Sequence, residues 1–268
     1  MAFLAGIAEQ SIIAFGLLLL AVQVVAHRIG IWMGRRAKAQ ATTQMEGVSV
    51  VVGGMLALMA FVLALTLSFA NTRFSERRTG TLAEANAIGT AWLRAKAVGT
   101  PRAEEIATLL EQYARVRADF VMAGIDVAHL DALNQKTSVL QSALWGHVAA
   151  IVREQPNPVS ALLMAALNDA FDMATAERFA METKFPPQLF WLLITMTLLS
   201  TGAVGYQLGL REKSQRMLVV LLMLMWTVVI VDILDLAAPR LGEFRTSAAP
   251  YEWTIQGFSG GLVIPPAP

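Results

Sequence analysis

The sequence contains no cysteine, and only 15% of its 268 residues are charged, against about 25% in ordinary soluble domains. The absence of cysteine excludes disulfides, thiol catalysis and thiolate metal ligands. The shortage of charge, with 56% hydrophobic residues and a mean hydropathy of +0.54, argues against a water-soluble enzyme, because a globule of this size has enough surface to demand more charge. A net charge of +1 offers no basic face for phosphates, so we expect no nucleic-acid partner.

Four apolar runs are each long enough to cross a lipid bilayer, for which about 20 predominantly apolar residues suffice. They lie approximately at residues 11–33, 48–70, 186–208 and 217–238. No basic residue precedes the first run, and its apolar stretch exceeds the length of a signal-peptide core, so we interpret it as a retained anchor. The sequence therefore predicts an all-α integral membrane protein with four transmembrane helices.

The two short connections between these helices are rich in basic residues, as is typical of cytoplasmic loops. The basic residues are Arg28, Arg35, Arg36 and Lys38 around the first connection and Arg211, Lys213 and Arg216 around the second. If both loops are cytoplasmic, both termini and the long segment between helices two and three lie outside. We therefore predict a multi-pass protein of the bacterial inner (plasma) membrane with a large periplasmic helical domain.

That long segment, residues 71–184, predicts an extramembrane four-helix domain, because a structureless connection of such length is uncommon. It separates transmembrane helices 1 and 2 (residues 1–70) from helices 3 and 4 (185–238), and an extramembrane tail (239–268) follows. Helix two continues past the membrane as a stem with an inward stripe, and the stem ends at Gly99 to Pro101. The stripe consists of Leu82, Ala85, Gly89 and Trp92.

Three further helices are expected after the stem, beginning near Arg102, Val127 and Pro158, the last capped by Asn157. The last of them returns to the membrane and pairs antiparallel with the stem. Its inward residues are predicted to be Leu162, Leu163, Ala166, Leu167, Ala170 and Ala174. The last dozen residues of the chain, rich in Gly and Pro, are expected to be loosely ordered.

Small residues recur on two of the transmembrane helices. Gly202, Gly205 and Gly209 give helix three a groove that lets a neighbouring backbone approach closely. Gly53 and Gly54 have no phosphate-loop residues after them, so we interpret them as packing glycines. Helix two also carries a stripe that either packs against a neighbour or lines a narrow pore in an oligomer: Ser49, Gly53, Ala57, Ala60, Ala64 and Ser68.

A charged cluster is predicted at the outer end of the membrane. Asp232 falls inside the last apolar run, where an isolated carboxylate costs several kcal/mol, so it needs a partner. Asp235 follows one turn later, and Arg73 and Arg77 reach a similar depth, with Glu84 two turns beyond. The cluster either clamps helix four to the stem or forms an ion-coordinating or proton-sensing site.

The sequence predicts no enzyme, no metal site and no cofactor. None of His27, His129 and His147 has a second ligand at the i, i+4 spacing of a helical metal site. The paired carboxylates Glu104 and Glu105 are expected on a solvated helix face, and no nucleophile with a base is evident.

The run from Glu84 to Arg94, EANAIGTAWLR, resembles a stretch of the bacterial bestrophin-like family, which is distantly related to bestrophin anion channels. The resemblance covers nearly the whole chain. Ala237 and Ala238 depart from it, because a charged residue is expected there. Further matching positions are Tyr113, Arg117, Asn168, Asp172, Arg178, Pro186, Pro187, Trp191, Asp235, Pro239, Arg240 and Gly242.

The resemblance implies a homo-oligomer, a pentamer in bestrophins, that conducts an inorganic ion, chiefly anions. Helix two would line the path, with Phe61 as a constriction that gates by dewetting. The implied lining residues are Gly53, Ala57, Phe61, Ala64 and Ser68. Bestrophins keep their large helical domain in the cytoplasm, which is the reverse of the orientation that the basic loops predict. The alternative function is a non-conducting structural or sensory membrane protein whose helical domain binds a partner.

Overall fold

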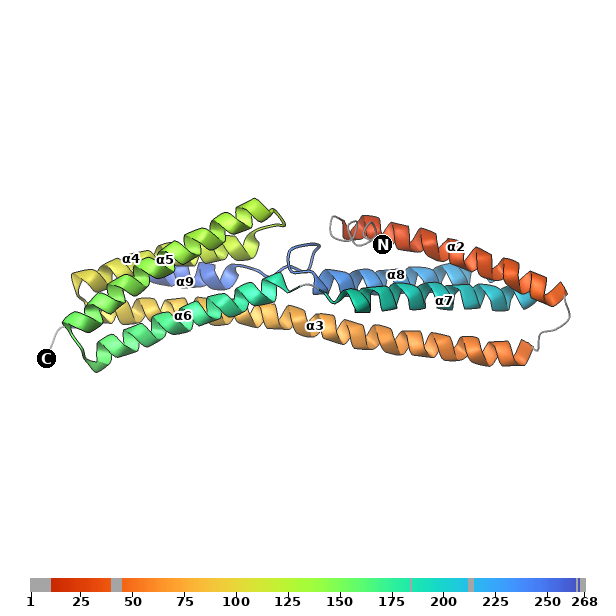
Figure 1. Ribbon diagram of the computed structural model, residues 1–268, viewed down its shortest axis with the longest axis horizontal. Helices are drawn as coiled ribbons and strands as arrows, with labels where there is room; N and C mark the ends of the chain where they lie inside the picture. Colours follow the sequence, from red (N-terminus) through yellow and green to blue (C-terminus); the bar gives the residue numbers. More distant parts are fainter. Residues whose placement is uncertain (1–10, 40–44, 184, 212–214, 264, 266–268) are drawn as a thin grey trace. The chain divides into compact units, whose positions relative to one another are not determined.

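The computed structural model describes residues 11–39, 45–183, 185–211, 215–263 and 265, and the first ten residues and Lys213, which entered the topology prediction, lie outside these ranges. Within them the chain is helical and contains no strand (Figure 1). The helices are α2 (Ile12–Ala39), α3 (Met45–Val98), α4 (Pro101–Met122), α5 (Val127–Glu154), α6 (Pro158–Glu182), α7 (Pro187–Arg211), α8 (Arg216–Ala237) and α9 (Ala249–Ser259).

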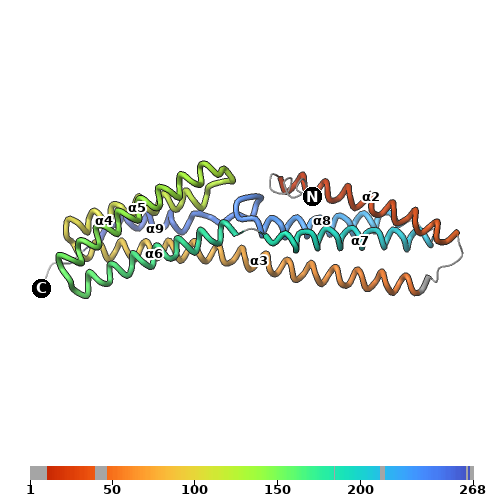
Figure 2. Tube along the Cα trace, in the orientation of Figure 1, coloured from red at the N-terminus to blue at the C-terminus, as the bar shows by residue number. Residues whose placement is uncertain are grey.

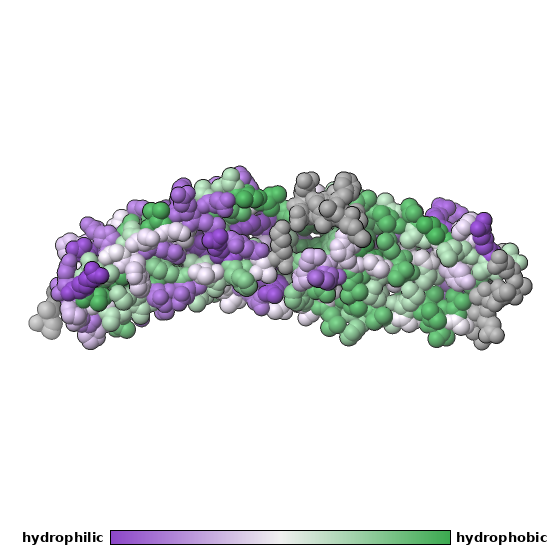
Figure 3. All heavy atoms as spheres, viewed as in Figure 1, coloured by the Kyte–Doolittle hydropathy of each residue, from purple (hydrophilic) through white to green (hydrophobic). Residues whose placement is uncertain are grey.

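The chain divides into two compact units, each built from segments distant in sequence. The membrane unit comprises Met1–Arg73 and Lys184–Phe244, and the stem unit comprises Phe74–Thr183 and Arg245–Pro268. Four segments of the described chain are long and apolar enough to span a membrane: Ile12–Ala39, Gly47–Val98, Pro158–Arg211 and Arg216–Ala237. Hydrophobic residues gather on the surface of α2, α7 and α8, and hydrophilic residues over α4 and α5 (Figure 3). These features confirm the predicted all-α membrane fold.

Glycines set the distance between α2 and α7 in the membrane unit. A Cβ atom added to Gly205 or Gly209 of α7 would overlap the carbonyl oxygen of His27 or Ile31 of α2, and Gly30 and Gly34 of α2 face α7 backbone in the same way. At Gly202 an added Cβ would make only an ordinary contact, 3.7 Å from Ala26 O. The predicted close packing at Gly205 and Gly209 is confirmed, and it requires glycine on both helices.

The start of α3 lies against the end of α7. The Ser49 hydroxyl accepts hydrogen bonds from Gln207 Nε2 at 3.0 Å and from Arg211 Nη2 at 2.7 Å. Gly209 of α7 also lies close to the backbone of Arg35 near the end of α2, so the start of α3 and the ends of α2 and α7 lie together (Figure 2). The basic residues of the last turns of α2 and α7 therefore lie at neighbouring helix ends.

The stem unit follows the predicted helix boundaries closely. α3 continues without a break to Val98, and Gly99, at φ +67°, turns the chain in a backbone conformation that L side chains rarely adopt. The Thr100 side chain then caps α4 by accepting from Ala103 N–H at 3.2 Å. Asn157 and Ser160 form a reciprocal capping box at the start of α6.

α6 and the stem part of α3 pair antiparallel, as predicted. Thr81 hydrogen-bonds Glu177 near one end of the pair, and Arg94 donates to Leu162 O at 2.7 Å near the other. The predicted inward positions are buried except for Gly89, which is half-buried, and for Leu82 and Leu162, which are 44% and 55% exposed. The predictions for Leu82 and Leu162 were wrong, because at 3.6 residues per turn each lies roughly 100–120° round its helix from the centre of the buried face.

A further helix, α9, completes the stem unit and was not predicted. Tyr251 and Phe258 are its buried residues, and the Phe258 ring lies 5.0 Å from that of Trp92 on α3, centroid to centroid. Thr254 donates a hydrogen bond to Ala85 O at 3.2 Å. Part of the expected loose tail is therefore ordered, and the four-helix domain gains a fifth element. Residues 264 and 266–268 of that tail lie outside the described chain.

Candidate functional site

The predicted pore-lining residues form an exposed stripe on α3. Gly53, Ala57, Phe61, Ala64 and Ser68 are all exposed in the single chain, Phe61 to 60%. The buried residues of the same segment are Val52, Met59, Leu63, Thr66 and Ala70. At 3.6 residues per turn the centres of the two sets lie roughly 150° apart round the helix. The face of α3 opposite the packed one is thus uncovered within the chain.

The two glycines interpreted as packing residues pack against nothing in the single chain. A Cβ added to Gly53 or Gly54 would have no atom of the described chain within 4 Å. The interpretation fails within one subunit, because both glycines lie on faces of α3 that no other helix of the chain covers.

A buried ion pair occupies the centre of the stem unit. Glu84, the first residue of the family-like run, and Arg117 of α4 are 0% and 1% exposed. Arg117 Nε lies 2.5 Å from Glu84 Oε1, and Arg117 Nη2 lies 3.0 Å from Glu84 Oε2, so the pair is bidentate. Burial lowers the pKa of a guanidinium, but the Glu84 carboxylate outweighs burial and raises the pKa of Arg117. The guanidinium therefore stays charged in a dry environment.

α9 is fastened to this ion pair. The Tyr251 hydroxyl donates to Glu84 Oε2 at 2.7 Å, and its side chain is 0% exposed. Burial, followed by the Glu84 charge, raises the pKa of Tyr251, so the phenol stays protonated and remains a donor. Glu84 thus joins three helices, α3, α4 and α9, through one carboxylate.

A second buried carboxylate lies in the same cluster. Glu177 of α6 is 0% exposed, and its Oε1 lies 2.7 Å from the Thr81 hydroxyl of α3. Arg77 is also buried and interacts electrostatically with Glu177. We call Arg77, Thr81, Glu84, Arg117, Glu177 and Tyr251 the buried polar cluster.

The residues of the predicted charged cluster fall in both compact units. Arg77 and Glu84 belong to the buried polar cluster, whereas Asp235 lies in the membrane unit and fastens a loop. Its Oδ2 accepts from Glu243 N–H at 3.0 Å and its Oδ1 from Phe244 N–H at 3.3 Å. Asp232 is exposed, so the two acids do not share an environment. The ion pair predicted for Asp232 stays a prediction.

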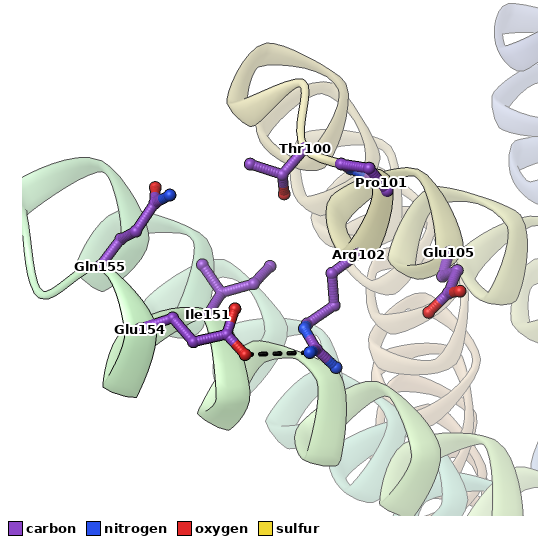
Figure 4. Close-up of a pocket in the computed structure, with 7 residues that line it drawn as sticks. All are labelled: Thr100, Pro101, Arg102, Glu105, Ile151, Glu154 and Gln155. Atoms are coloured by element: carbon purple, nitrogen blue, oxygen red, sulfur yellow. Dashed lines mark hydrogen bonds and ion pairs between the residues drawn. The ribbon is translucent and has the colours of Figure 1, made fainter.

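A depression of about 430 Å³ lies where the α3–α4 turn meets the end of α5 (Figure 4). Arg102 and Glu154 line it and pair with each other at 2.9 Å, while Glu105 and Gln155 also face it. This ion pair is solvent-exposed, and the Glu105 carboxylate lies 3.0 Å from His147 Nδ1, so both acids that line the depression already have a partner.

Sequence reasoning identified Glu84 but not Thr81, Glu177 and Tyr251. One signal was available, because Glu177 falls in register with the inward residues Ala170 and Ala174 of α6. An ionisable residue at an inward position of an amphipathic helix indicates a buried polar contact.

The fold is that of an all-helical membrane protein in which one helix continues from the membrane unit into a helical stem unit. A family model for the Bestrophin-like domain matches residues 17–251, and the chain belongs to that family. No curated protein matches the sequence.

Two solved structures share the fold over most of their length. One is a mutant of a bacterial bestrophin homologue from Klebsiella pneumoniae, with a TM-score of 0.69 and 13% identity, covering 93% of this chain and 96% of that chain. The other is a mutant described as a membrane protein, with a TM-score of 0.65 and 12% identity, covering 93% and 97%. At such identity the likeness concerns the fold alone.

Proposed function

We propose that the protein is the subunit of an oligomeric membrane channel that conducts anions, with α3 lining the path. The observation that carries the proposal is the exposed stripe on α3. Its small side chains lie opposite the packed face of the helix and are left without a partner inside the chain. Membership of the Bestrophin-like family supports a ring of copies, a pentamer by analogy with bestrophins, in which these faces surround a common axis.

Phe61 is the large apolar residue of this stripe and is proposed as the constriction. A narrow apolar ring resists wetting, and widening it lowers the barrier to ions. Phe61→Ala is therefore expected to raise chloride flux from vesicles reconstituted with the purified protein. Leu221→Ala on α8 is the matched control, because Leu221 is 59% exposed, like Phe61, but lies on another helix. If both variants assemble normally and conduct equally, Phe61 is not the constriction of the path.

The lack of cysteine allows a second test of the lining. Ala64→Cys introduces the sole thiol of the sequence, and a water-soluble charged thiol reagent is expected to change the flux of this variant. Val220→Cys, on an exposed face of α8 outside the proposed path, should show no change in flux with the same reagent. An assembled protein that conducts no ion under any of these conditions would support the alternative, a structural or sensory membrane protein.

We propose that the stem unit lies on the periplasmic side of the inner membrane, because the basic ends of α2 and α7 lie together and favour the cytoplasm. A reporter active only outside the cytoplasm should give a signal when fused at Pro156 and none when fused at Lys213. A signal at Lys213 and none at Pro156 would place the stem unit in the cytoplasm, as in bestrophins.

Asp232 is proposed to pair with a cation in the assembled protein, because an exposed carboxylate on a membrane-spanning helix is costly without one. Asp232→Asn is expected to lower the melting temperature of the oligomer. Arg73→Gln should be non-additive with it if Arg73 is the partner, and additivity would eliminate Arg73.

A further inference from the structure

Glu177 makes an incomplete set of hydrogen bonds for a buried carboxylate. Its side chain is fully buried between α6 and α3, and only Oε1 has a partner, the Thr81 hydroxyl at 2.7 Å. Oε2 has no hydrogen-bond partner in the described chain and lies against the backbone of Gly80, where an added Cβ would overlap it. A buried anion normally accepts several hydrogen bonds, so this environment suits a neutral carboxyl group better.

The Thr81 hydroxyl faces two acceptors but has one proton. Its oxygen lies 3.0 Å from Arg77 O and 2.7 Å from Glu177 Oε1. If Glu177 is ionised, the hydroxyl must choose between the two. If Glu177 carries a proton on Oε1, it donates to Thr81, and Thr81 donates to Arg77 O. Both short contacts are then satisfied at the same time.

The charges around Glu177 come from several helices. Arg77 and Glu84 on α3, Arg117 on α4 and Tyr251 on α9 interact with it. Arg117 is already paired with Glu84, so it is not a dedicated counter-ion for Glu177. Arg77 is the other cation that interacts with Glu177, and its charge favours the ionised carboxylate. The ionisable residues of α5, the other helix packed on α6, are exposed or half-buried: His129, Asp131, Lys136, His147, Arg153 and Glu154.

We propose that Glu177 is a proton-binding site of the stem unit and that its protonated form holds α6 against α3. Loss of the proton leaves a buried carboxylate with one hydroxyl donor beside the charged Glu84, which loosens the contact between the two helices. The chemical class of the ligand is the proton alone, and the site needs neither a metal nor ion conduction.

The pH range follows from the environment of the group. Burial, assisted by Glu84, raises the pKa of Glu177 to about 7 from 4.5, although Thr81, Arg117 and Arg77 oppose the shift. Since the folded protein binds this proton more tightly than the unfolded chain, the contribution to stability is complete below pH 4.5. It is lost as the pH rises through about 7.

The test compares Glu177→Gln with the native protein in detergent. Glutamine copies the shape of the protonated acid and has no proton to lose. Glu182→Gln is the matched control, because Glu182 lies on the same helix but is solvent-exposed, paired with Arg178. Between about pH 5 and about pH 8, the melting temperature of the native protein and the control should fall by roughly 5 °C relative to Glu177→Gln.

Infrared spectroscopy reads the proton directly. The native protein should show the C=O stretching band of a protonated carboxyl group that disappears as the pH rises through neutrality, and Glu177→Gln should lack this band. If Glu177→Gln fails to assemble, the infrared measurement uses the variant Thr81→Val instead. The band should then persist to higher pH, because the ionised acid has lost its charge-assisted donor. A native melting profile parallel to that of Glu177→Gln, or a band that neither variant changes, overturns the proposal.

Discussion

Breaking the buried ion pair of the stem unit should be far more harmful than breaking an exposed one. Arg117→Ala leaves Glu84 buried with the Tyr251 hydroxyl as its remaining donor among the described residues. Removing one partner of a buried pair typically costs about 3–5 kcal/mol, because the remaining charge keeps its desolvation penalty. At about 2–4 °C per kcal/mol for a chain of this size, the melting temperature should fall by roughly 10 °C. Glu84 and Arg117 stabilise the stem unit only when both charges are present.

Thermal melting of the solubilised protein, followed by circular dichroism, measures this effect. Glu84→Gln with Arg117→Ala should cost less than the sum of the two single changes, since neither then strands a full charge. Arg178→Ala is the control, because Arg178 and Glu182 form an exposed pair at 2.7 Å worth about 0.3–0.5 kcal/mol. If Arg117→Ala shifts the melting temperature no more than Arg178→Ala, the buried pair does not stabilise the stem unit as the geometry indicates.

Two further changes test the packing described above. Tyr251→Phe removes one hydroxyl that donates to the charged Glu84. A hydrogen bond to a charged group is worth about 1.5–3 kcal/mol, so chemical denaturation should show a loss of stability of that size. An unchanged denaturation midpoint would show that this hydrogen bond does not hold α9 in place. Gly205→Ala should lower the melting temperature and the yield of folded protein, because the added Cβ overlaps His27 O. Gly53→Ala is the control and should lower neither, because the space around Gly53 is open. Equal behaviour of the two variants would contradict the close approach of α2 and α7.

Helix periodicity predicts most of the stem unit because two of its helix boundaries have a local chemical cause. Gly99 and Pro101 separate α3 from α4, and Asn157 with Pro158 begins α6, so both breaks can be located from the sequence. α9 escaped prediction because it is short. Its buried residues, Tyr251 and Phe258, recur after seven positions, too few turns to outweigh the Gly and Pro that follow.

The candidate site is predictable only where one helix determines it. The exposed stripe of α3 follows from the spacing of its small residues, since a single helix fixes which positions share a face. The buried polar cluster needs the register of α3 against α4, α6 and α9. No local sequence pattern predicts that Glu84 contacts Arg117, or that Thr81 lies opposite Glu177. Such contacts depend on how far each helix slides along its neighbour.

The attachment of α9 to Glu84 gives the protein a fixed order of assembly during synthesis. Glu84 and Arg117 leave the ribosome early, and the two apolar helices α7 and α8 follow before Tyr251 is made. Until α7 and α8 have been synthesised, the Glu84 carboxylate therefore lacks the hydroxyl donor that α9 supplies. A nascent chain stalled in membrane insertion keeps an incomplete stem, which exposes it to proteolysis, because cleavage follows the population of open forms.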